Sequence, residues 1–304
     1  MDVGLIYNPA AGSGWSRRPG IEAVREALRA AGGEVETFPT RGPRDGFAQG
    51  RVAAAHAQVV AVYGGDGTVN ETLNGVVEAG SAATVLLLPG GTVNVLARDL
   101  KIPLHPLRAA QLLATGAPRI IYLGRATSKN LPGGQRYFAL MAGAGLDASV
   151  VYHMGFRRRA KKALGPWAFV AEGLRHAQRY PFPEIQVSAD EGAALRGYFA
   201  VVGNSPGYAG WFSLTPAADP GVPGFQAAVC TERRAWRYFY YLGLALAGRL
   251  ERSRDFLFLP AAHVRMTASE NVRVQMDGEY AGTLPMEFSS DGPTVRVLTP
   301  SAIP

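Results

Sequence analysis

Short apolar runs alternate with amphipathic segments over the first 125 residues. Four runs predict strands, at residues 3–7, 34–38, 59–63 and 84–88. Between and after them, apolar positions recur at helical spacing and predict helices, at residues 21–31, 45–55, 68–79, 94–99 and 107–115. Strands that alternate so regularly with helices are typical of parallel βαβ units. Residues 1–125 are therefore predicted to form an α/β domain with a doubly wound parallel sheet.

The pattern changes after residue 125. Strand-like runs then follow one another at modest spacing, at residues 137–142, 185–188, 198–202, 225–230, 256–259, 264–267, 272–276 and 295–298. Helical segments are predicted only at 163–179 and 235–249. Many short strands are typical of an antiparallel sandwich or barrel, so residues 126–290 are predicted to form a β-rich domain. Residues 291–304 form a C-terminal segment that we expect to return to the first domain.

The composition indicates a folded protein with anionic ligands or partners. A chain of 304 residues is long enough for about two domains. With 47% hydrophobic and 18% charged residues it can bury a core and is unlike a disordered chain. The net charge is +7, and only four of the 31 basic residues are lysines. A basic balance favours nucleotides, phosphates or acidic membrane surfaces as partners, without choosing among them.

Several classes of protein are excluded by their missing features. With Cys230 alone, neither an intramolecular disulfide nor a multi-cysteine zinc cluster can form, and the five histidines contain no H-E-x-x-H motif. No nucleic-acid partner is expected, because the positive charge is spread out and no recognised module is present. The N-terminus lacks the features of a signal peptide, and the longest apolar stretch, residues 238–248, is too short to span a membrane. We expect a cytoplasmic protein with transient, peripheral membrane contact.

Three loops at predicted strand ends share one property: each is rich in small residues and opens toward a helix. They lie at residues 8–14, 64–68 and 89–94. In a doubly wound sheet such loops meet at the carboxyl edge of the strands, where ligands bind. Glycine permits close backbone approach, and free N–H groups at a helix start attract anionic oxygen. Three such loops together predict a polyphosphate site.

The class of phosphate site can be narrowed. A Walker A loop requires Gly-Lys-Ser/Thr, and none of the four lysines follows a glycine. Residues 65–70 miss the G-x-G-x-x-G pattern of dinucleotide-binding proteins at its last position. Asp66 lies where it would repel a pyrophosphate, unless Mg²⁺ lies between carboxylate and phosphate oxygens. The sequence therefore favours Mg-ATP as the ligand, with Asp66 next to the metal.

The chain resembles a known family at this point. Residues 64–71 (GGDGTVNE) look like the signature of the diacylglycerol kinase catalytic domain, a group that includes bacterial diacylglycerol kinases and sphingosine and ceramide kinases. Further motifs of that family are matched, in order, at residues 6–14, 89–98, 142–148 and 276–279. The resemblance thus runs over about 270 residues. It implies an α/β domain, a β-rich second domain and an active site in the cleft between them.

The resemblance also implies functional residues. Asp66 would help to hold the Mg²⁺ of ATP, and Glu279 or its neighbour Asp277 would be the base that takes a proton from a lipid hydroxyl. Asp147, in the motif at 142–148, would lie on the substrate side. The residues expected to contact ATP are Asn8, Pro9, Ala10, Ala11, Gly12, Thr40, Gly64, Gly65, Asp66, Gly67, Thr68, Asn70, Glu71, Gly91, Thr92 and Asn94.

Plainer interpretations remain open for several of these residues. Asp277-Gly278 is by itself a strong type I′ hairpin signal. Asp147 could cap a helix instead of facing substrate. Residues 157–162 (RRRAKK), with Trp167 and Phe169 after them, are either a solvated face or a contact with anionic lipid. A second, structural Mg²⁺ site of bacterial relatives is in doubt, because Pro223 stands where an aspartate is expected.

The leading hypothesis is an ATP- and Mg²⁺-dependent lipid kinase that acts on a diacylglycerol-like or sphingoid lipid. One alternative is an NAD kinase-like enzyme, which would share the G-G-D-G-T motif. Another is a nucleotide- or lipid-binding regulator without catalysis, against which the intact Asp66, Asp277 and Glu279 argue. A homodimer is compatible with the sequence.

Overall fold

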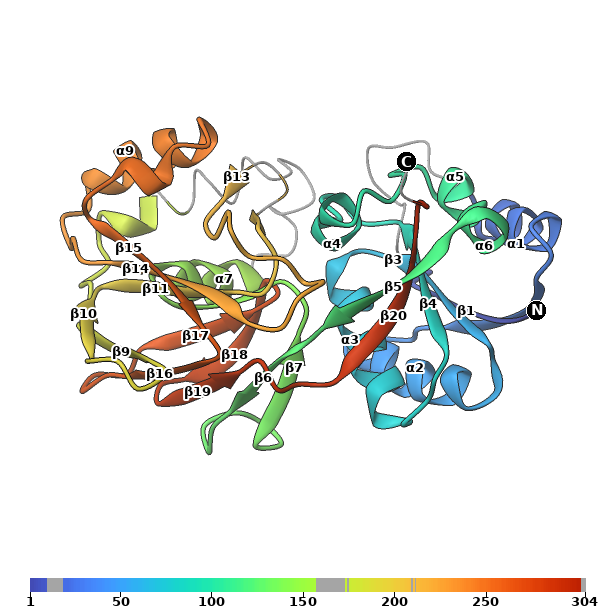
Figure 1. Cartoon of the computed structure of the whole chain (residues 1–304), viewed down its shortest axis with the longest axis horizontal. Coiled ribbons are helices and arrows are strands. Elements are labelled where there is room, and N and C mark those ends of the chain that lie inside the picture. Colours follow the sequence, from blue (N-terminus) through green and yellow to red (C-terminus); the bar gives the residue numbers. More distant parts are fainter. Residues whose placement is uncertain (10–18, 157–172, 174, 209, 211, 302–304) are drawn as a thin grey trace. The chain divides into compact units, whose positions relative to one another are not determined.

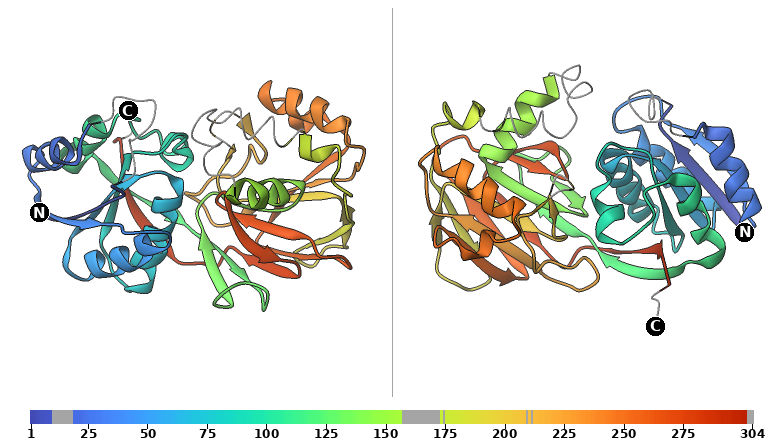
Figure 2. Two further views of the ribbon diagram at one scale, coloured as in Figure 1. Left: turned by 180° about the vertical axis from the view of Figure 1, so that it is seen from behind. Right: turned by 90° about the horizontal axis from the view of Figure 1, so that it is seen from above.

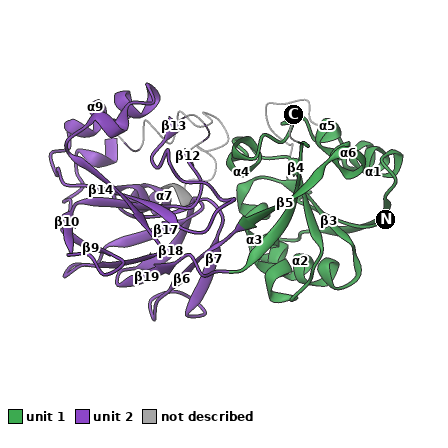
Figure 3. Cartoon of the chain, viewed as in Figure 1, with its two compact units in different colours: residues 1–121, 293–304 green, residues 122–292 purple. Residues whose placement is uncertain are grey.

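The computed structural model describes residues 1–9, 19–156, 173, 175–208, 210 and 212–301 (Figure 1). The chain divides into two compact units (Figure 3). Unit 1 comprises Met1–Ile121 and Pro293–Pro304, and unit 2 comprises Tyr122–Gly292. The chain therefore passes from one unit to the other twice.

Unit 1 is built on a six-stranded sheet with the order β2-β1-β3-β4-β20-β5. The pairs β2–β1, β1–β3, β3–β4 and β4–β20 are all parallel. Figures 1 and 2 show the red β20 beside the green β5, although all of unit 2 lies between them in the sequence. The strands span Asp2–Tyr7 (β1), Glu34–Pro39 (β2), Val59–Gly64 (β3), Thr84–Pro89 (β4), Ala117–Tyr122 (β5) and Thr294–Thr299 (β20).

Helices cover both faces of this sheet. All six residues of β3 are buried, as expected for a central strand with helices on either side. Helix α1 lies beside α5, and α2 lies beside α3, where a Cβ on Gly75 would be only 2.2 Å from the Phe47 carbonyl oxygen. Glycine therefore sets how closely α2 and α3 approach. The helices span Ile21–Ala30 (α1), Asp45–His56 (α2), Asp66–Glu78 (α3), Val95–Asp99 (α4), Pro106–Ala110 (α5) and Leu112–Thr115 (α6).

Unit 2 contains two six-stranded antiparallel sheets and a short hairpin, β12–β13. One sheet has the order β10-β9-β16-β19-β6-β7, with strands Leu195–Gly197, Ile185–Ala189, His263–Thr267, Met286–Ser289, Gly124–Thr127 and Gln135–Phe138. The other has the order β15-β14-β11-β8-β17-β18, with strands Phe256–Ala261, Phe225–Cys230, Phe199–Gly203, Met141–Gly145, Arg273–Met276 and Glu279–Thr283. The hairpin pairs Gly207–Tyr208 (β12) with Phe212–Ser213 (β13).

Residues of both sheets meet in one hydrophobic core, in which Phe138 of β7 packs against Phe225 of β14 and Phe288 of β19. Alternate positions of the strands face this core, as in a sandwich. The predicted fold class, a doubly wound α/β domain followed by a β-rich, sandwich-like domain, is thereby confirmed.

Unit 2 also contains two helices and a 3₁₀ turn, Leu146–Phe156 (α7), Arg237–Leu246 (α9) and Leu250–Arg252 (η1). Leu146 and Val150 of α7 belong to a second, smaller hydrophobic cluster, against which Tyr238 of α9 packs. Helix α9 lies within the predicted segment 235–249, whereas most of the segment predicted at 163–179 lies outside the described residues. Among the helices that are described, none combines the length and apolar character needed to cross a membrane.

Candidate functional site

The carboxyl edge of the unit 1 sheet has a reversal of strand order between β1 and β3. From β1 the chain moves outward to β2, and it then returns past β1 to β3 and continues to β4. The loops after β1 and β3 start side by side, because the Asn8 amide donates to the Tyr63 carbonyl at 3.3 Å. Ligands of open α/β sheets bind at such a reversal. Pro9 is the last described residue of the first loop, so Ala10, Ala11 and Gly12 lie outside the described residues.

The loops after β3 and β4 are joined backbone to backbone. The Gly90 amide donates to the Gly64 carbonyl at 2.7 Å. A Cβ on Gly91 would lie 2.4 Å from the Gly65 Cα, so only glycine allows this approach. The Asn94 side chain closes the second loop by accepting from the Gly91 amide and donating to the Gly91 carbonyl, both at 2.8 Å. This edge is therefore a rigid surface of peptide groups.

Asp66 connects the helices that follow these two loops. It is the first residue of α3, and its Oδ1 accepts a hydrogen bond from the amide of Val95, the first residue of α4, at 2.7 Å. The side chain thus orients both helix starts toward the same edge. A carboxylate held at two helix N-termini is electrostatically stabilised there.

The predicted ATP residues on α3 have structural contacts of their own. Glu71 accepts hydrogen bonds from the amides of Arg44 and Gly46, at 2.8 and 2.9 Å, and so caps the start of α2. The Asn70 side chain is buried. Thr68 lies so close to Gly64 that a Cβ on Gly64 would be 2.7 Å from the Cβ of Thr68. These side chains therefore hold the loops at the carboxyl edge of the sheet in place. Gly67, in the first turn of α3, is half-buried.

Thr40 and Thr92 lie at different depths along this edge. The Thr40 amide continues the β2–β1 pairing by donating to the Tyr7 carbonyl at 2.9 Å, and its residue is buried. Thr92, in the loop closed by Asn94, is exposed.

In unit 2, Asp277 and Gly278 form the turn between β17 and β18. Both have positive φ, 50° and 79°, and Met276 pairs with Glu279 across them, as in a type I′ hairpin. The buried Asp277 carboxylate accepts three backbone hydrogen bonds, from Ala139, Leu140 and Met141, at 2.8 to 3.0 Å. Burial raises the pKa of Asp277, and these three donors oppose the rise. Asp277 therefore anchors the turn to the segment before β8.

Glu279 follows directly and has a different environment. Its side chain is 40% exposed, and Oε2 accepts a hydrogen bond from Arg136 Nη2 of β7 at 2.7 Å. The salt bridge orients the carboxylate without enclosing it. Of the two acids in this turn, Glu279 is the one with an accessible carboxylate.

Asp147 is a buried acid at the start of α7. Oδ1 accepts from the Tyr208 hydroxyl, and Oδ2 accepts from Gln275 Nε2 at 2.8 Å. Burial raises the pKa of Asp147 to about 6, although both hydrogen bonds lower it. A Cβ on Gly143 would lie 2.6 Å from Asp147 Oδ2, so that glycine makes room for the carboxylate. The side chain faces a pocket instead of capping α7.

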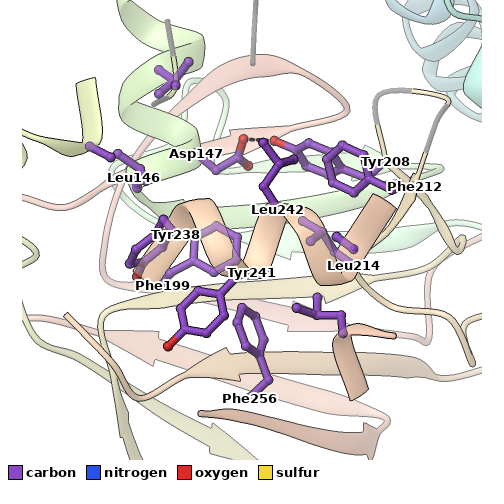
Figure 4. A pocket seen from close by; sticks show the side chains of 15 residues that line it. Leu146, Asp147, Phe199, Tyr208, Phe212, Leu214, Tyr238, Tyr241, Leu242 and Phe256 are labelled. Atoms are coloured by element: carbon purple, nitrogen blue, oxygen red, sulfur yellow. Dashed lines mark hydrogen bonds between the residues drawn. The ribbon is translucent and has the colours of Figure 1, made fainter. Parts of the chain in front are cut away.

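Asp147 and Tyr208 form the polar end of this pocket (Figure 4). The cavity volume of the pocket is about 140 Å³. The Tyr238 and Tyr241 hydroxyls are engaged by the Glu232 carbonyl and the Asp255 carboxylate, at 3.1 and 2.6 Å. The remaining walls are apolar and include Leu146, Val150, Phe199, Phe212, Leu214, Leu242, Ala245, Leu250 and Phe256.

Gln275 links this pocket to the turn. Its amide nitrogen donates to Asp147, and its Oε1 accepts from the Gly278 amide at 2.8 Å. The hydrogen bonds therefore run from the polar end of the pocket through Gln275 to Gly278, the residue that precedes Glu279 in the chain.

Comparison with known proteins assigns the two units. The model described as "Diacylglycerol kinase catalytic domain" matches residues 2–126, and "YegS C-terminal NAD kinase beta sandwich-like domain" matches residues 141–300. The chain belongs to the family of proteins that combine a diacylglycerol kinase catalytic domain with a YegS-type C-terminal domain. The predicted resemblance is confirmed, and so is the expectation of an enzyme of the lipid kinase class.

Relatives of this family match the chain nearly end to end. The diacylglycerol kinase of Bacillus subtilis (strain 168) is 26% identical over 302 residues, which cover 97% of this chain and 95% of the relative. That of Staphylococcus carnosus is 25% identical over 302 residues, covering 98% and 95%. A crystal structure of a diacylglycerol kinase from Bacillus anthracis covers 100% of this chain and 98% of its own, at 18% identity and a TM-score of 0.70, and so shows the same fold.

Sequence reasoning missed three residues that complete the unit 2 site in this family member: Arg136, Tyr208 and Gln275. Gln275 carried a signal, because it is a polar residue within an apolar strand run, and it is 2% exposed. Nothing near Arg136 or Tyr208 distinguished these residues from others in loops and short strands.

The structure gives no support to a second metal site in this family member. Among the residues it describes, no group of three or more His, Cys, Asp or Glu side chains could hold an ion. The exposed Asp219 accepts the Gly221 amide at 2.8 Å, and Pro223 follows without a carboxylate.

Proposed function

We propose that this enzyme transfers the γ-phosphate of ATP to the hydroxyl of a diacylglycerol-like or sphingoid lipid, with Mg²⁺ bound to the nucleotide. The observation that carries the proposal is the unit 2 pocket, which has apolar walls and one acidic, hydrogen-bonding end. An amphiphile with a long alkyl chain and one polar group has the complementary chemistry. Curated relatives named diacylglycerol kinase support this substrate class.

ATP binds at the carboxyl edge of unit 1. The peptide groups of the loops at Gly64-Gly65 and Gly90-Gly91 approach the phosphates, and the N-terminus of α3 adds N–H donors and a favourable dipole. Mg²⁺ takes one or two carboxylates together with phosphate oxygens, and Asp66 supplies a carboxylate among these loops. When bound, the metal neutralises charge on the transferred phosphoryl group. Thr40, Thr92 and Asn8 are the further contacts that we propose.

The lipid lies in the pocket of unit 2. Its alkyl chain packs against Tyr238, Tyr241 and Phe256, and its polar group exchanges hydrogen bonds with Asp147 and Tyr208. Gln275 keeps the Asp147 carboxylate in place from the opposite side.

Glu279 is the base that we propose, in preference to Asp277. Asp277 already accepts three backbone hydrogen bonds and is buried, whereas the Glu279 carboxylate is accessible and is oriented by Arg136. A carboxylate within hydrogen-bond reach of an alcohol accepts its proton as the oxygen bonds to phosphorus. The bond from phosphorus to the ADP oxygen breaks in the same transfer, and ADP leaves.

The proposal is tested by incubating the purified chain with γ-labelled ATP, Mg²⁺ and separate mixed micelles of diacylglycerol, monoacylglycerol, sphingosine and ceramide, with NAD in a further reaction. Label is expected in one or more lipids and absent from NADP. Replacing Asp66 with Asn, which still accepts the Val95 amide, is expected to abolish transfer without lowering the unfolding temperature.

Each contrary outcome identifies an alternative. Labelled NADP would establish the hypothesis of an NAD kinase-like enzyme. If no acceptor is labelled although the chain binds ATP, the protein would be a non-catalytic regulator. Loss of product on chelation by EDTA, restored by excess Mg²⁺, is the expected metal dependence.

A further inference from the structure

Helix α9 has two faces of different character. Its inner positions, Tyr238, Tyr241, Leu242 and Ala245, line the pocket. Its outer positions, together with Trp236 just before the helix, carry large apolar side chains that are exposed: Trp236 is 61% exposed, Tyr240 51%, Leu246 45% and Phe239 44%. The spacing 236, 239, 240, 243, 246 is that of one stripe along a helix, so these side chains share one side.

Arginines lie at both ends of this stripe. Arg233 and Arg234 precede α9, and Arg249, Arg252 and Arg254 follow it. Arg234 pairs with Glu232, and Arg237 pairs with Asp255. Within the described residues, Arg233, Arg249, Arg252 and Arg254 form no ion pair, and all four are exposed. Glu251 is the one exposed acid in 233–254, so the stripe has a positive border.

We infer that the outer face of α9 docks the enzyme on an anionic phospholipid surface, with Trp236, Phe239, Tyr240 and Leu246 in the interface and the bordering arginines on headgroup phosphates. We define this set of side chains as the α9 docking face.

The chemistry of the α9 docking face fits a lipid surface. Tryptophan and tyrosine favour the membrane interface, where one end of the side chain is apolar and the other is wet. A short helix with an apolar face lies in the plane of the interface, and each basic residue near an anionic surface adds electrostatic attraction. Arg234 and Arg237 also lie over the Trp236 ring, with their Cζ atoms at 5.7 and 5.6 Å from its centroid.

The inference rests on the proposed function, because a lipid substrate gives the enzyme a reason to dock. The inference also extends the proposed function, because the same ten-residue helix presents the docking face outward and walls of the pocket inward. A lipid leaving a surface held by α9 therefore has one helix thickness to cross before it reaches the pocket.

Vesicle flotation tests the inference without ATP. The full chain is mixed with vesicles of phosphatidylglycerol and phosphatidylcholine, and with vesicles of phosphatidylcholine alone. Binding is expected to the anionic vesicles, and it should weaken in high salt. The variant Trp236→Ala/Tyr240→Ala should lower partitioning by about tenfold or more, and Arg249→Glu/Arg252→Glu should do so at low salt.

Matched controls lie in unit 1: Ile120→Ala removes an apolar side chain that is 51% exposed, and Arg29→Glu reverses an exposed arginine. Both should bind like the original chain. The α9 variants should retain phosphorylation of a short-chain diacylglycerol below its micelle concentration, which separates this inference from the proposed function: no phosphorylation by any chain contradicts the latter alone.

Equal vesicle binding by the α9 variants and the controls would overturn the inference. So would equally strong binding to pure phosphatidylcholine, or a dimer in sedimentation that Trp236→Ala/Tyr240→Ala dissociates, because the face would then be an interface between two copies of the chain.

Discussion

The two candidate binding regions, one in each unit, differ in the groups that form them. In unit 1 the edge consists of peptide groups, brought together by Gly64, Gly65 and Gly91, and its side chains mostly hold the loops in place. In unit 2 the site consists of side chains: Asp147, Tyr208 and Gln275 at a pocket, with Glu279 in the turn that Gln275 contacts.

This difference matches the two ligands that we propose. A triphosphate offers many equivalent oxygens, which a rigid set of N–H groups binds regardless of side chains. A lipid offers one polar group and a featureless chain, so its recognition needs a few placed polar atoms and a shaped apolar wall. Substitutions should therefore act through backbone shape in unit 1 and through individual functional groups in unit 2.

The largest effect should come from the accessible acid of the turn. Glu279→Gln removes the proposed base and is expected to lower kcat by about 10²–10⁴-fold. The unfolding temperature should change little, because a partly exposed ion pair such as Glu279–Arg136 contributes at most about 1 kcal/mol. Steady-state kinetics and thermal unfolding measure the two quantities.

Glu287→Gln is the matched control, since Glu287 is an exposed acid of the same unit that pairs with Arg265 at 3.6 Å. It should keep the original kcat. An unchanged kcat in Glu279→Gln would mean that another group takes the proton.

The neighbouring acid should affect stability instead. Asp277→Ala leaves the buried amides of Ala139, Leu140 and Met141 without their acceptor, and it puts alanine at a φ of 50°. The free energy of unfolding in urea is expected to fall by about 3 kcal/mol or more. Asp291→Ala, in an exposed position that pairs with Arg125, serves as control and should cost below about 1 kcal/mol. Equal losses in both variants would show that the three amides find other acceptors.

Asp147 predicts a pH dependence. Its pKa is about 6 in the folded chain against a reference of 3.8, so the folded state binds the proton more tightly. The resulting stabilisation is complete below about pH 4 and is lost as the pH rises through about 6, on the order of 3 kcal/mol in all. Asp147→Asn cannot ionise, so the original chain should lose stability relative to this variant over that window.

Urea unfolding at several pH values provides the measurement, and Asp219→Asn, an exposed position, should run parallel to the original chain. Parallel curves for Asp147→Asn as well would contradict a protonated Asp147 in the folded state.

The smallest effect is expected from a substitution in the loops that form the carboxyl edge of the unit 1 sheet. Gly91→Ala places a Cβ 2.4 Å from the Gly65 Cα, and neither backbone can yield easily. We expect a loss of about 1 kcal/mol or more in stability and a raised KM for ATP, with the KM for lipid unchanged. Gly20→Ala meets nothing within 4 Å and is the control. A KM for ATP that stays the same in Gly91→Ala would argue against phosphate binding at these loops.

The sequence could predict the features that depend on neighbouring residues, which are mostly the loops of unit 1, better than the pocket of unit 2. The fold class was predictable because the alternation of strands and helices, and later of short strands, is local. The glycine loops of unit 1 were recognisable because each is a continuous stretch at a strand end, and the Asp277-Gly278 turn because two residues determine it. Their roles in binding and catalysis stay predictions.

The pocket chemistry could not be predicted, because it depends on pairs far apart in the sequence. Tyr208 and Gln275 meet Asp147 from 61 and 128 residues away, through the order of strands β11, β8 and β17 in one sheet. The burial of Asp277 likewise depends on amides 136 to 138 residues earlier. No local pattern distinguishes the enclosed acid from the accessible one two positions later.

The position of β20 has a consequence for how the protein is made. Since β20 lies between β4 and β5, the first sheet is incomplete until Thr294–Thr299 have been synthesised. While unit 2 is being synthesised, the edges of β4 and β5 that pair with β20 have no partner strand. A chain that stops near residue 290 keeps the strands of unit 2 but lacks β20, so a premature stop this late should still disrupt the sheet of unit 1.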